Sequence, residues 1–234
     1  MKAHHAACPI SAVTRPELLV GLIAVVALAA VIIPTFQPRG PTYTGKAATV
    51  VKNIVNACKA YHNEYGHFPS IPAARDRIEG TPPEVYLSFG DIAEGRCKIS
   101  NNQLFFVLRA MAEGPNADDA LNPRKTRYFE DHKATSKLRP REGFTDGPDF
   151  PATARGRLMD PWGTEYCIIL DADQDDAINL GAFYQDLAAG EKTVRSSAVA
   201  FSLGKDGKRG GKGYEGMFRR PKKDDAPEDV VSWE

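Results

Sequence analysis

The stretch Glu17-Leu18-Leu19-Val20-Gly21-Leu22-Ile23-Ala24-Val25-Val26-Ala27-Leu28-Ala29-Ala30-Val31-Ile32-Ile33-Pro34 places one carboxylate directly before sixteen consecutive apolar residues. No charged residue occurs from Leu18 through Pro38. A helix rises about 1.5 Å per residue, so this segment would span roughly 30 Å, the thickness of a bilayer core. The chain after Arg39 is polar. The sequence therefore predicts a water-exposed domain that one N-terminal helix tethers to a membrane.

The composition of the chain excludes several classes of function. The 234 residues include 30 Lys and Arg and 30 Asp and Glu, so no net charge attracts a polyanion, and we expect no nucleic-acid partner. The five histidines show no metal-binding spacing, and no Walker, Rossmann or nucleophile-elbow pattern occurs in a suitable context. The sequence therefore predicts a protein that is not an enzyme.

Four cysteines are too few for a disulfide framework. Cys8 precedes the apolar stretch, and Cys58, Cys97 and Cys167 follow it. One disulfide among these three is an alternative. We favour buried, reduced side chains, because a free cysteine behaves as a small hydrophobic residue.

Three interpretations of the N-terminal stretch are open. Lys2 and the sequence Ala27-Leu28-Ala29 fit a secretory signal that is cut before Ala30. A plain membrane anchor explains the length of the apolar run but not the acid at its edge, where an ionisable group is costly without a partner. The mature N-terminus distinguishes the three: Ala30 indicates a secreted domain, Met1 a plain anchor, and Val13 the third interpretation.

The third interpretation is a family resemblance. Glu17, the apolar residues after it and Pro34 resemble the N-terminal segment of type IV pilins and of type II secretion pseudopilins. The resemblance implies a leader, residues 1–12, cut between Ala12 and Val13, with N-methylation of Val13. Residues 13–37 then form a helix that spans the membrane and assembles subunits. In this family the glutamate pairs with the terminal amine of a neighbouring subunit, which offsets the cost of an unpaired charge.

Residues 38–69 are expected to continue this helix after an interruption. Residues 35–45 contain two prolines and two glycines, which break or kink a helix. A stripe at helical spacing follows, made by Val51, Ile54, Val55, Cys58, Tyr61 and Tyr65. Gly66 and Pro69 end the helix. Its last turn and the residues up to Pro69 resemble the corresponding stretch of pseudopilins.

The middle of the chain, residues 70–157, is expected to be a variable insertion with one helix. Ser100 and Gln103 form a capping box at the start of a helix over Ser100–Glu113. Its buried stripe is predicted to be Leu104, Val107, Leu108 and Met111. Gly114-Pro115 ends the helix, and the charge, proline and glycine of residues 116–157 predict long loops.

Residues 158–234 are expected to form β-structure. Asp160-Pro161-Trp162-Gly163 is a turn, Tyr166–Leu170 a strand, Ala177–Leu180 its returning partner and Ser197–Leu203 a further strand. The spellings at this turn, at Ser202–Gly207 and at Glu228–Trp233 resemble the major pseudopilin of type II secretion. The predicted fold class is α+β, with a long N-terminal membrane-spanning helix packed on a small antiparallel β-sheet.

Two acidic groups are candidates for Ca²⁺, a hard cation that prefers several oxygen ligands. Asp171, Asp173 and Asp175 open like an EF-hand loop, but Asp176 holds the glycine position and Ala182 the place of the bidentate glutamate, so we favour a solvated turn. The second group follows from the family resemblance, which implies a calcium site near the C-terminus formed by Asp206, Glu228, Asp229 and the Leu203 carbonyl, with Asp224 and Asp225 as alternatives.

Taken together, the resemblance implies a non-enzymatic pseudopilin-like subunit in a bacterial inner membrane, with a single membrane pass and a periplasmic C-terminal domain. Such a subunit polymerises through its N-terminal helix into a pseudopilus for type II protein secretion. Its partners are copies of itself, other pseudopilins, the prepilin peptidase and the inner-membrane secretion platform. The alternative function is a single-pass anchored or secreted domain that binds a ligand of unknown identity.

Overall fold

The computed structural model describes residues 42–78, 84–90, 97–135, 138–180, 193–205, 207 and 229–232. These residues belong to one compact unit, Pro41–Glu234. The predicted leader and membrane helix, residues 1–12 and 13–37, lie outside the described residues. No helix within the described ranges combines the length and the apolarity that a membrane crossing requires.

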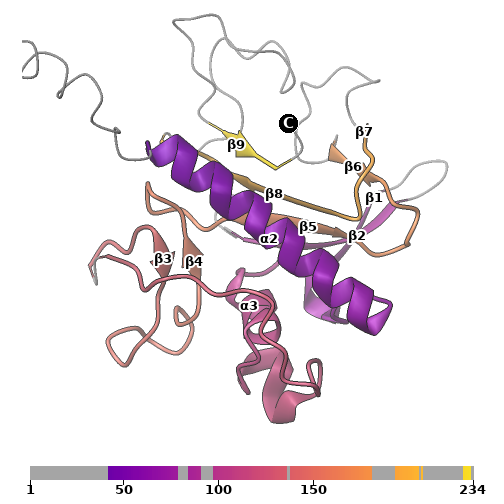
Figure 1. Cartoon of the computed structure of the whole chain (residues 1–234), viewed down its shortest axis with the longest axis horizontal. Helices are drawn as coiled ribbons and strands as arrows, with labels where there is room; N and C mark the ends of the chain where they lie inside the picture. The colour runs from indigo at the N-terminus through magenta and orange to yellow at the C-terminus, as the bar shows by residue number, and fades with distance from the viewer. Residues whose placement is uncertain are drawn as a thin grey trace, which may run out of the picture. The chain divides into compact units, whose positions relative to one another are not determined.

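Helix α2, Tyr43–Tyr65, is the longest described element and runs diagonally across the sheet (Figure 1). The Thr42 side chain caps its N-terminus by accepting a hydrogen bond from the Gly45 N–H at 3.1 Å. This cap explains why the helix begins inside the stretch that was predicted to interrupt it. At the other end Gly66 adopts a left-handed conformation, φ 75°, and its N–H bonds to the His62 carbonyl. The predicted C-terminal end is therefore confirmed.

The predicted stripe of α2 is also confirmed. Residues at helical spacing are buried against the sheet, and the neighbouring Val55 and Tyr65 are partly buried against the same core; the buried set is Ala47, Val51, Ile54, Ala57, Cys58 and Tyr61. The helix packs mainly on β8, Ala198–Ser202, and β9, Val230–Val231. Because side chains three and four positions apart share one face, this single stripe buries one face of the helix from Ala47 to Tyr61.

The sheet has five strands in the order β1-β2-β5-β8-β9, and every neighbouring pair is antiparallel. The remaining strands are β1, Arg75–Ile78; β2, Glu84–Phe89; and β5, Cys167–Asp171. The predicted α+β class with an antiparallel sheet is thus confirmed. β1 and β2 form two-fifths of the sheet, and neither was predicted from the sequence.

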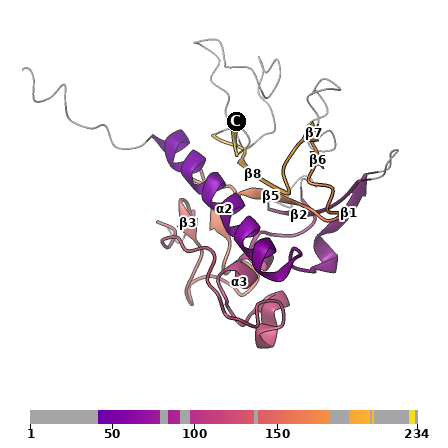
Figure 2. The same ribbon diagram turned by 45° about the vertical axis from the view of Figure 1, so that its right-hand side comes forward.

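The central strands β5 and β8 are buried on both faces. Alternate residues of β5 and β8 contribute to two cores: Ile168, Leu170, Ala198 and Ala200 pack toward α2, while Cys167, Ile169, Val199 and Phe201 pack toward a second cluster with Ile178 and Leu180. The turned view shows α2 covering one face of the sheet while β6 and β7 lie away from it (Figure 2). Central strands buried on both sides read as continuous apolar runs, which is the pattern that predicted β5 and β8.

Helix α3, Asn102–Leu108, is shorter than the predicted Ser100–Glu113. The carbonyl of its last residue, Leu108, accepts a hydrogen bond from the Tyr128 N–H at 2.8 Å. Ala110 has a φ of 53°, so the helix cannot continue. The predicted capping box is wrong as well. The Ser100 hydroxyl donates to Glu165 Oε2 at 2.8 Å, and the Asn101 N–H bonds to the same oxygen. A buried carboxylate far along the chain thus replaces the local cap.

Asn101 joins α3 to the strands. Its side-chain amide donates to the carbonyls of Leu158 and Tyr166, and its oxygen accepts from the Leu158 N–H at 3.0 Å. The following loops, which contain the 3₁₀ segment η3, Gly114–Asp119, are held in the same way by the buried Asn116 and Asn122. A second 3₁₀ segment, η1, covers Pro72–Ala74. Long loops over residues 116–157 were predicted and are confirmed, apart from one short strand.

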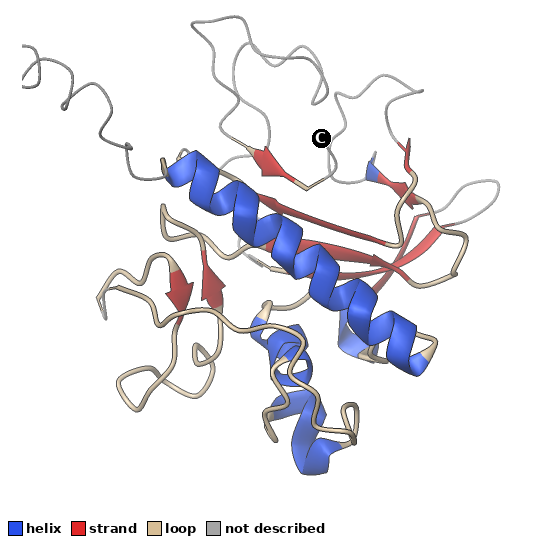
Figure 3. Ribbon diagram, in the orientation of Figure 1, coloured by secondary structure: helices blue, strands red, loops and turns tan. Residues whose placement is uncertain are grey.

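Two small antiparallel pairs lie outside the main sheet (Figure 3). β3, Gly143–Phe144, pairs with β4, Leu158–Met159. β6, Ile178–Asn179, pairs with β7, Thr193–Val194. The prediction that Ala177–Leu180 returns as the partner of the 166–170 strand is therefore wrong, because β5 is already paired on both edges by β2 and β8.

Asp160 fastens the predicted turn to the sheet. Its Oδ1 accepts hydrogen bonds from the N–H groups of Trp162, Gly163 and Thr164 at 2.9, 2.7 and 2.8 Å. Its Oδ2 accepts from the Ser202 hydroxyl at 2.6 Å. The side chain is fully buried, and burial raises its pKa above the ordinary value despite these four donors. From the sequence, Asp160 was predicted only to be the first residue of the turn.

Cys58, Cys97 and Cys167 are buried, and no disulfide links any two of them. The favoured interpretation of these residues as buried hydrophobic side chains is confirmed. Burial raises the pKa of Cys58 to about 12, since the thiolate would have to form in an apolar core.

Candidate functional site

The structure places two of the predicted calcium ligands opposite each other. Phe201 pairs with Val231 and Ser202 with Val230, so the antiparallel register, continued by one residue, sets Leu203 against Asp229 at the end of the β8–β9 ladder. Leu203 is fully buried and Asp229 is 7% exposed. Gly204 follows with φ 64°, which turns the chain away from the strand. The other proposed ligands, Asp206, Glu228, Asp224 and Asp225, lie outside the described residues.

The residues predicted to act in processing and assembly also lie outside the described ranges. These are Ala12 and Val13 at the proposed cleavage point, and Glu17 and Pro34 in the proposed assembly helix.

The turn after β5 brings three carboxylates together. One oxygen from each of Asp171, Asp173 and Asp175 lies within 4.8 Å of the others. Asp171, however, is 2% exposed and accepts hydrogen bonds from the backbone N–H groups of Asp173, Gln174 and Asp176. The interpretation of this stretch as a solvated turn is therefore wrong for Asp171, whose side chain is a buried cap that folds the turn, and holds for the exposed Asp173 and Asp175.

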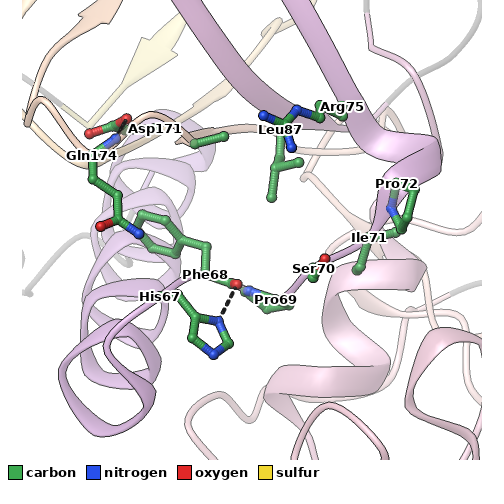
Figure 4. Close-up of a pocket in the computed structure, with 11 residues that line it drawn as sticks. His67, Phe68, Pro69, Ser70, Ile71, Pro72, Arg75, Leu87, Asp171 and Gln174 are labelled. Carbon is green, nitrogen blue, oxygen red and sulfur yellow. Dashed lines mark hydrogen bonds between the residues drawn. The ribbon is translucent and has the colours of Figure 1, made fainter.

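Asp171 also forms part of the wall of a pocket of about 240 Å³ between the segment that follows α2, the start of β1, β2 and the turn after β5 (Figure 4). His67 and Phe68 lie along one border of this pocket, where the His67 ring bonds to the Phe68 carbonyl at 2.8 Å. Arg75 and Leu87 lie at another border, and Gln174 completes the side that Asp171 begins. The pocket thus joins one buried acid, one arginine and an apolar wall.

Burial raises the pKa of Asp171 to about 6, and the neighbouring Asp173 side chain acts in the same direction. The pKa of an aspartate in an unfolded chain is about 3.9. Between these two pH values the folded chain therefore binds more protons than the unfolded chain. The stabilising contribution of this group is therefore present below about pH 4 and is lost as the pH rises through about 6.

We expect Asp171→Asn to flatten this dependence. The free energy of unfolding of the wild type, relative to the variant, should fall by roughly 1–2 kcal/mol between pH 4 and pH 6.5; the full conversion of two pKa units overstates the effect because the exposed Asp173 is screened by solvent. Urea unfolding at several pH values measures this difference. Parallel pH profiles of the two proteins would show that Asp171 does not titrate in this window.

Comparison of the chain with known protein families, with curated proteins and with solved structures finds no match.

Proposed function

We propose that this chain is a pseudopilin-like structural subunit of a bacterial inner membrane. In this proposal the N-terminal helix crosses the membrane once, the C-terminal domain lies in the periplasm, and subunits polymerise through the helix into a pseudopilus for type II protein secretion. The partners would be further copies of the chain, other pseudopilins, the prepilin peptidase and the inner-membrane secretion platform. The proposed role needs no enzymatic activity.

The observation that carries the proposal is the order of elements after the apolar stretch. A long amphipathic helix, α2, comes first and lies on an antiparallel sheet whose last strand, β9, is close to the C-terminus. This order supports an assembly subunit, because a domain folded around α2 leaves the apolar stretch that precedes it in the sequence for contacts with other subunits. The family resemblance of residues 13–69 and 158–234 points to the same role.

Glu17→Val tests the assembly step. The proposal pairs the Glu17 carboxylate with the terminal amine of a neighbouring subunit at the edge of the hydrocarbon, where an unpaired charge is costly. We expect the variant to insert at least as well as the wild type, because removal of a charge lowers the cost of transfer, and to lose crosslinked multimers almost completely. Membrane fractionation and chemical crosslinking in cells measure the two effects separately.

Thr14→Val is the matched control, since it also removes a polar side chain near the start of the apolar stretch but keeps the acid. It should insert and crosslink like the wild type. Unchanged multimers in Glu17→Val would remove the acid from the assembly mechanism, and sequencing of the mature N-terminus would then decide between a secreted domain and a plain anchor.

We also propose that Ca²⁺ binds at the C-terminus through Asp206, Glu228, Asp229 and the Leu203 carbonyl. The support is the position of Asp229, which lies opposite Leu203 at the end of the β8–β9 ladder and is largely buried. Carboxylate ligands gathered around one site would repel one another without a cation, so metal binding and folding should be coupled.

We expect the midpoint of thermal unfolding to depend on Ca²⁺. Ca²⁺ at about 100 times its dissociation constant should stabilise the chain by roughly 2.7 kcal/mol, measured by thermal unfolding with Ca²⁺ or with EDTA. Asp206→Ala should abolish the gain. Asp173→Ala, which alters the other acidic group, should keep it. If EDTA leaves the wild-type midpoint unchanged, the C-terminal residues hold no calcium.

A further inference from the structure

A cavity of about 320 Å³ lies between the N-terminal half of α2, the segment that precedes β3, and the connection from β4 to β5. It is distinct from the pocket beside Asp171 and from the proposed calcium residues. Its apolar wall includes Val50, Phe129 and Met159. Its polar lining includes Lys46, Asp131 and Glu142. β3 lies beside this half of α2 in both views, and Figure 1 shows β4 next to β3 (Figures 1 and 2).

Tyr166 also lines this cavity, and no described residue bonds to its hydroxyl. The residue is only 1% exposed, so the aromatic ring is held in the core. Its backbone groups bond to Leu158 and Asn101, but within the described part of the chain its phenolic oxygen makes no hydrogen bond. The ring is therefore fixed by the core, while the phenolic oxygen is left available to a ligand in the cavity.

Two carboxylates near Tyr166 have acceptor capacity to spare. Glu142 Oε1 pairs with Lys46 Nζ at 2.6 Å, and Asp131 Oδ1 bonds to the His132 ring nitrogen at 2.6 Å. The second oxygen of each carboxylate accepts no hydrogen bond from any residue in the described ranges. Both carboxylates act electrostatically on Tyr166 and, together with its burial and the buried Asp160, raise the pKa of its phenol, so the hydroxyl keeps its proton.

The charge of the lining selects the sign of a ligand. Glu130, Asp131 and Glu142 contribute three negative charges, and Lys46 contributes the positive charge that persists when His132 is neutral. The cavity therefore carries an excess of negative charge behind an apolar wall. A cation on an aliphatic stem matches this arrangement, because the stem can cover Val50 and Met159 while the charged end donates to several oxygens.

We propose that this cavity binds an alkylguanidinium or alkylammonium group, which donates hydrogen bonds to Glu142, Asp131 and the Tyr166 oxygen. A guanidinium suits it best, since a planar fork of five N–H donors can bond to more than one of these acceptors at once. The group can be a free amine or guanidine, or the side chain of an arginine or lysine. The inference is independent of the assembly function proposed above.

Removal of the Lys46 charge and removal of the Glu142 charge should change the affinity for a cation in opposite directions. The Lys46 ammonium already occupies one oxygen of Glu142, so it competes with an added cation and repels it. Lys46→Met keeps most of the aliphatic stem but removes the charge, and should tighten binding of n-butylguanidinium by about fivefold. Glu142→Gln removes a carboxylate and should weaken binding by at least about fivefold. A cavity that binds anions would show the opposite pair of changes.

Tyr166→Phe tests the hydroxyl. Because this oxygen has no partner in the described residues, its removal should leave the thermal midpoint of the unbound protein nearly unchanged. It should weaken binding of n-butylguanidinium by about tenfold, which is the value of one hydrogen bond to a charged group. Glu113→Gln is the matched control for Glu142→Gln: it breaks a comparable ion pair, with Arg155 at 2.6 Å, away from the cavity, and should not alter binding.

The full-length chain in detergent, labelled with ¹³C at its methionine methyl groups, provides the measurement. The Met159 signal should shift and saturate with n-butylguanidinium, but not with 1-pentanol or butyrate of similar length. Capped arginine distinguishes the source: binding at least as tight as n-butylguanidinium indicates a protein side chain, and weaker binding indicates a free amine or guanidine. No saturation with either cation, or unchanged affinity in Tyr166→Phe, would overturn the proposal.

Discussion

Asp160→Ala is expected to lower the free energy of unfolding by about 4 kcal/mol. The substitution removes the acceptor for three backbone N–H groups and for the Ser202 hydroxyl, all of which face the fully buried carboxylate. Each orphaned buried donor costs about 1–3 kcal/mol. We take a value near the lower end of the sum, because Trp162, Gly163 and Thr164 are partly exposed and water can satisfy some of them.

Asp160→Asn isolates the hydrogen bonds from the charge. Asparagine retains an oxygen at the Oδ1 position, and its amide can donate to Ser202, so the loss should be about 1–2 kcal/mol. Asp175→Ala, which removes an exposed aspartate that caps a single backbone N–H, should cost less than about 1 kcal/mol. Urea unfolding followed by circular dichroism ranks the three variants. An Asp160→Ala protein within 1 kcal/mol of the wild type would contradict the role of this carboxylate as the fastener of the turn.

Gly90→Ala is expected to be nearly as damaging, with a loss of at least about 3 kcal/mol. Gly90 ends β2 with φ 142°, and a Cβ atom there would lie 2.8 Å from the Cys167 Cα and 2.8 Å from the Tyr166 carbonyl oxygen. Both neighbours are backbone atoms at the start of β5. They cannot yield without opening the β2–β5 pairing, which buries the centre of the sheet.

Gly66→Ala is the matched control for this prediction. Gly66 also has a positive φ, 75°, but a Cβ atom there meets nothing within 4 Å. The control should therefore lose only about 1 kcal/mol, the usual cost of a left-handed alanine. Thermal unfolding of both variants separates the close approach from the backbone conformation. Equal losses at the two sites would show that β2 and β5 can move apart.

The elements that were predicted correctly carry local signals. α2 has a continuous stripe at helical spacing and a glycine at its end, and both signals lie within the helix itself. β5 and β8 are apolar runs because each is buried on both faces. In these segments the periodicity of the chain and the environment of the fold agree, so the sequence alone was sufficient.

The elements that were missed depend on partners far away in the sequence. β1 reads as Arg75-Asp76-Arg77-Ile78, a charged stretch that becomes a strand only because it adds to the edge of the sheet at β2. The Ser100 hydroxyl, which was predicted to cap a helix, instead donates a hydrogen bond to Glu165, 65 residues later. Nothing local reveals such pairings.

The candidate sites divide in the same way. Asp171 was recognised as acidic, but its burial follows from its position as the last residue of β5, whose pairing the sequence does not specify. The cavity at Tyr166 is assembled from α2, the segment before β3 and the β4–β5 connection, so no short motif marks it. Leu203 and Asp229 were predicted as calcium ligands from the family resemblance. They lie opposite each other because of the register between β8 and β9.

The three buried thiols can report how the domain unfolds, because each reacts only when its surroundings open. Disulfide exchange requires a thiolate, and a group with a pKa of about 12 supplies only about one thiolate in ten thousand molecules at pH 8. A labelling reagent therefore reacts with Cys58 only when the fold opens, and burial likewise shields Cys97 and Cys167 from it. Cys58 faces the core beneath α2, whereas Cys97 and Cys167 lie in the cluster on the opposite face of the sheet. The order in which the three react reports whether the helix detaches before the strands separate or whether both faces open in one event.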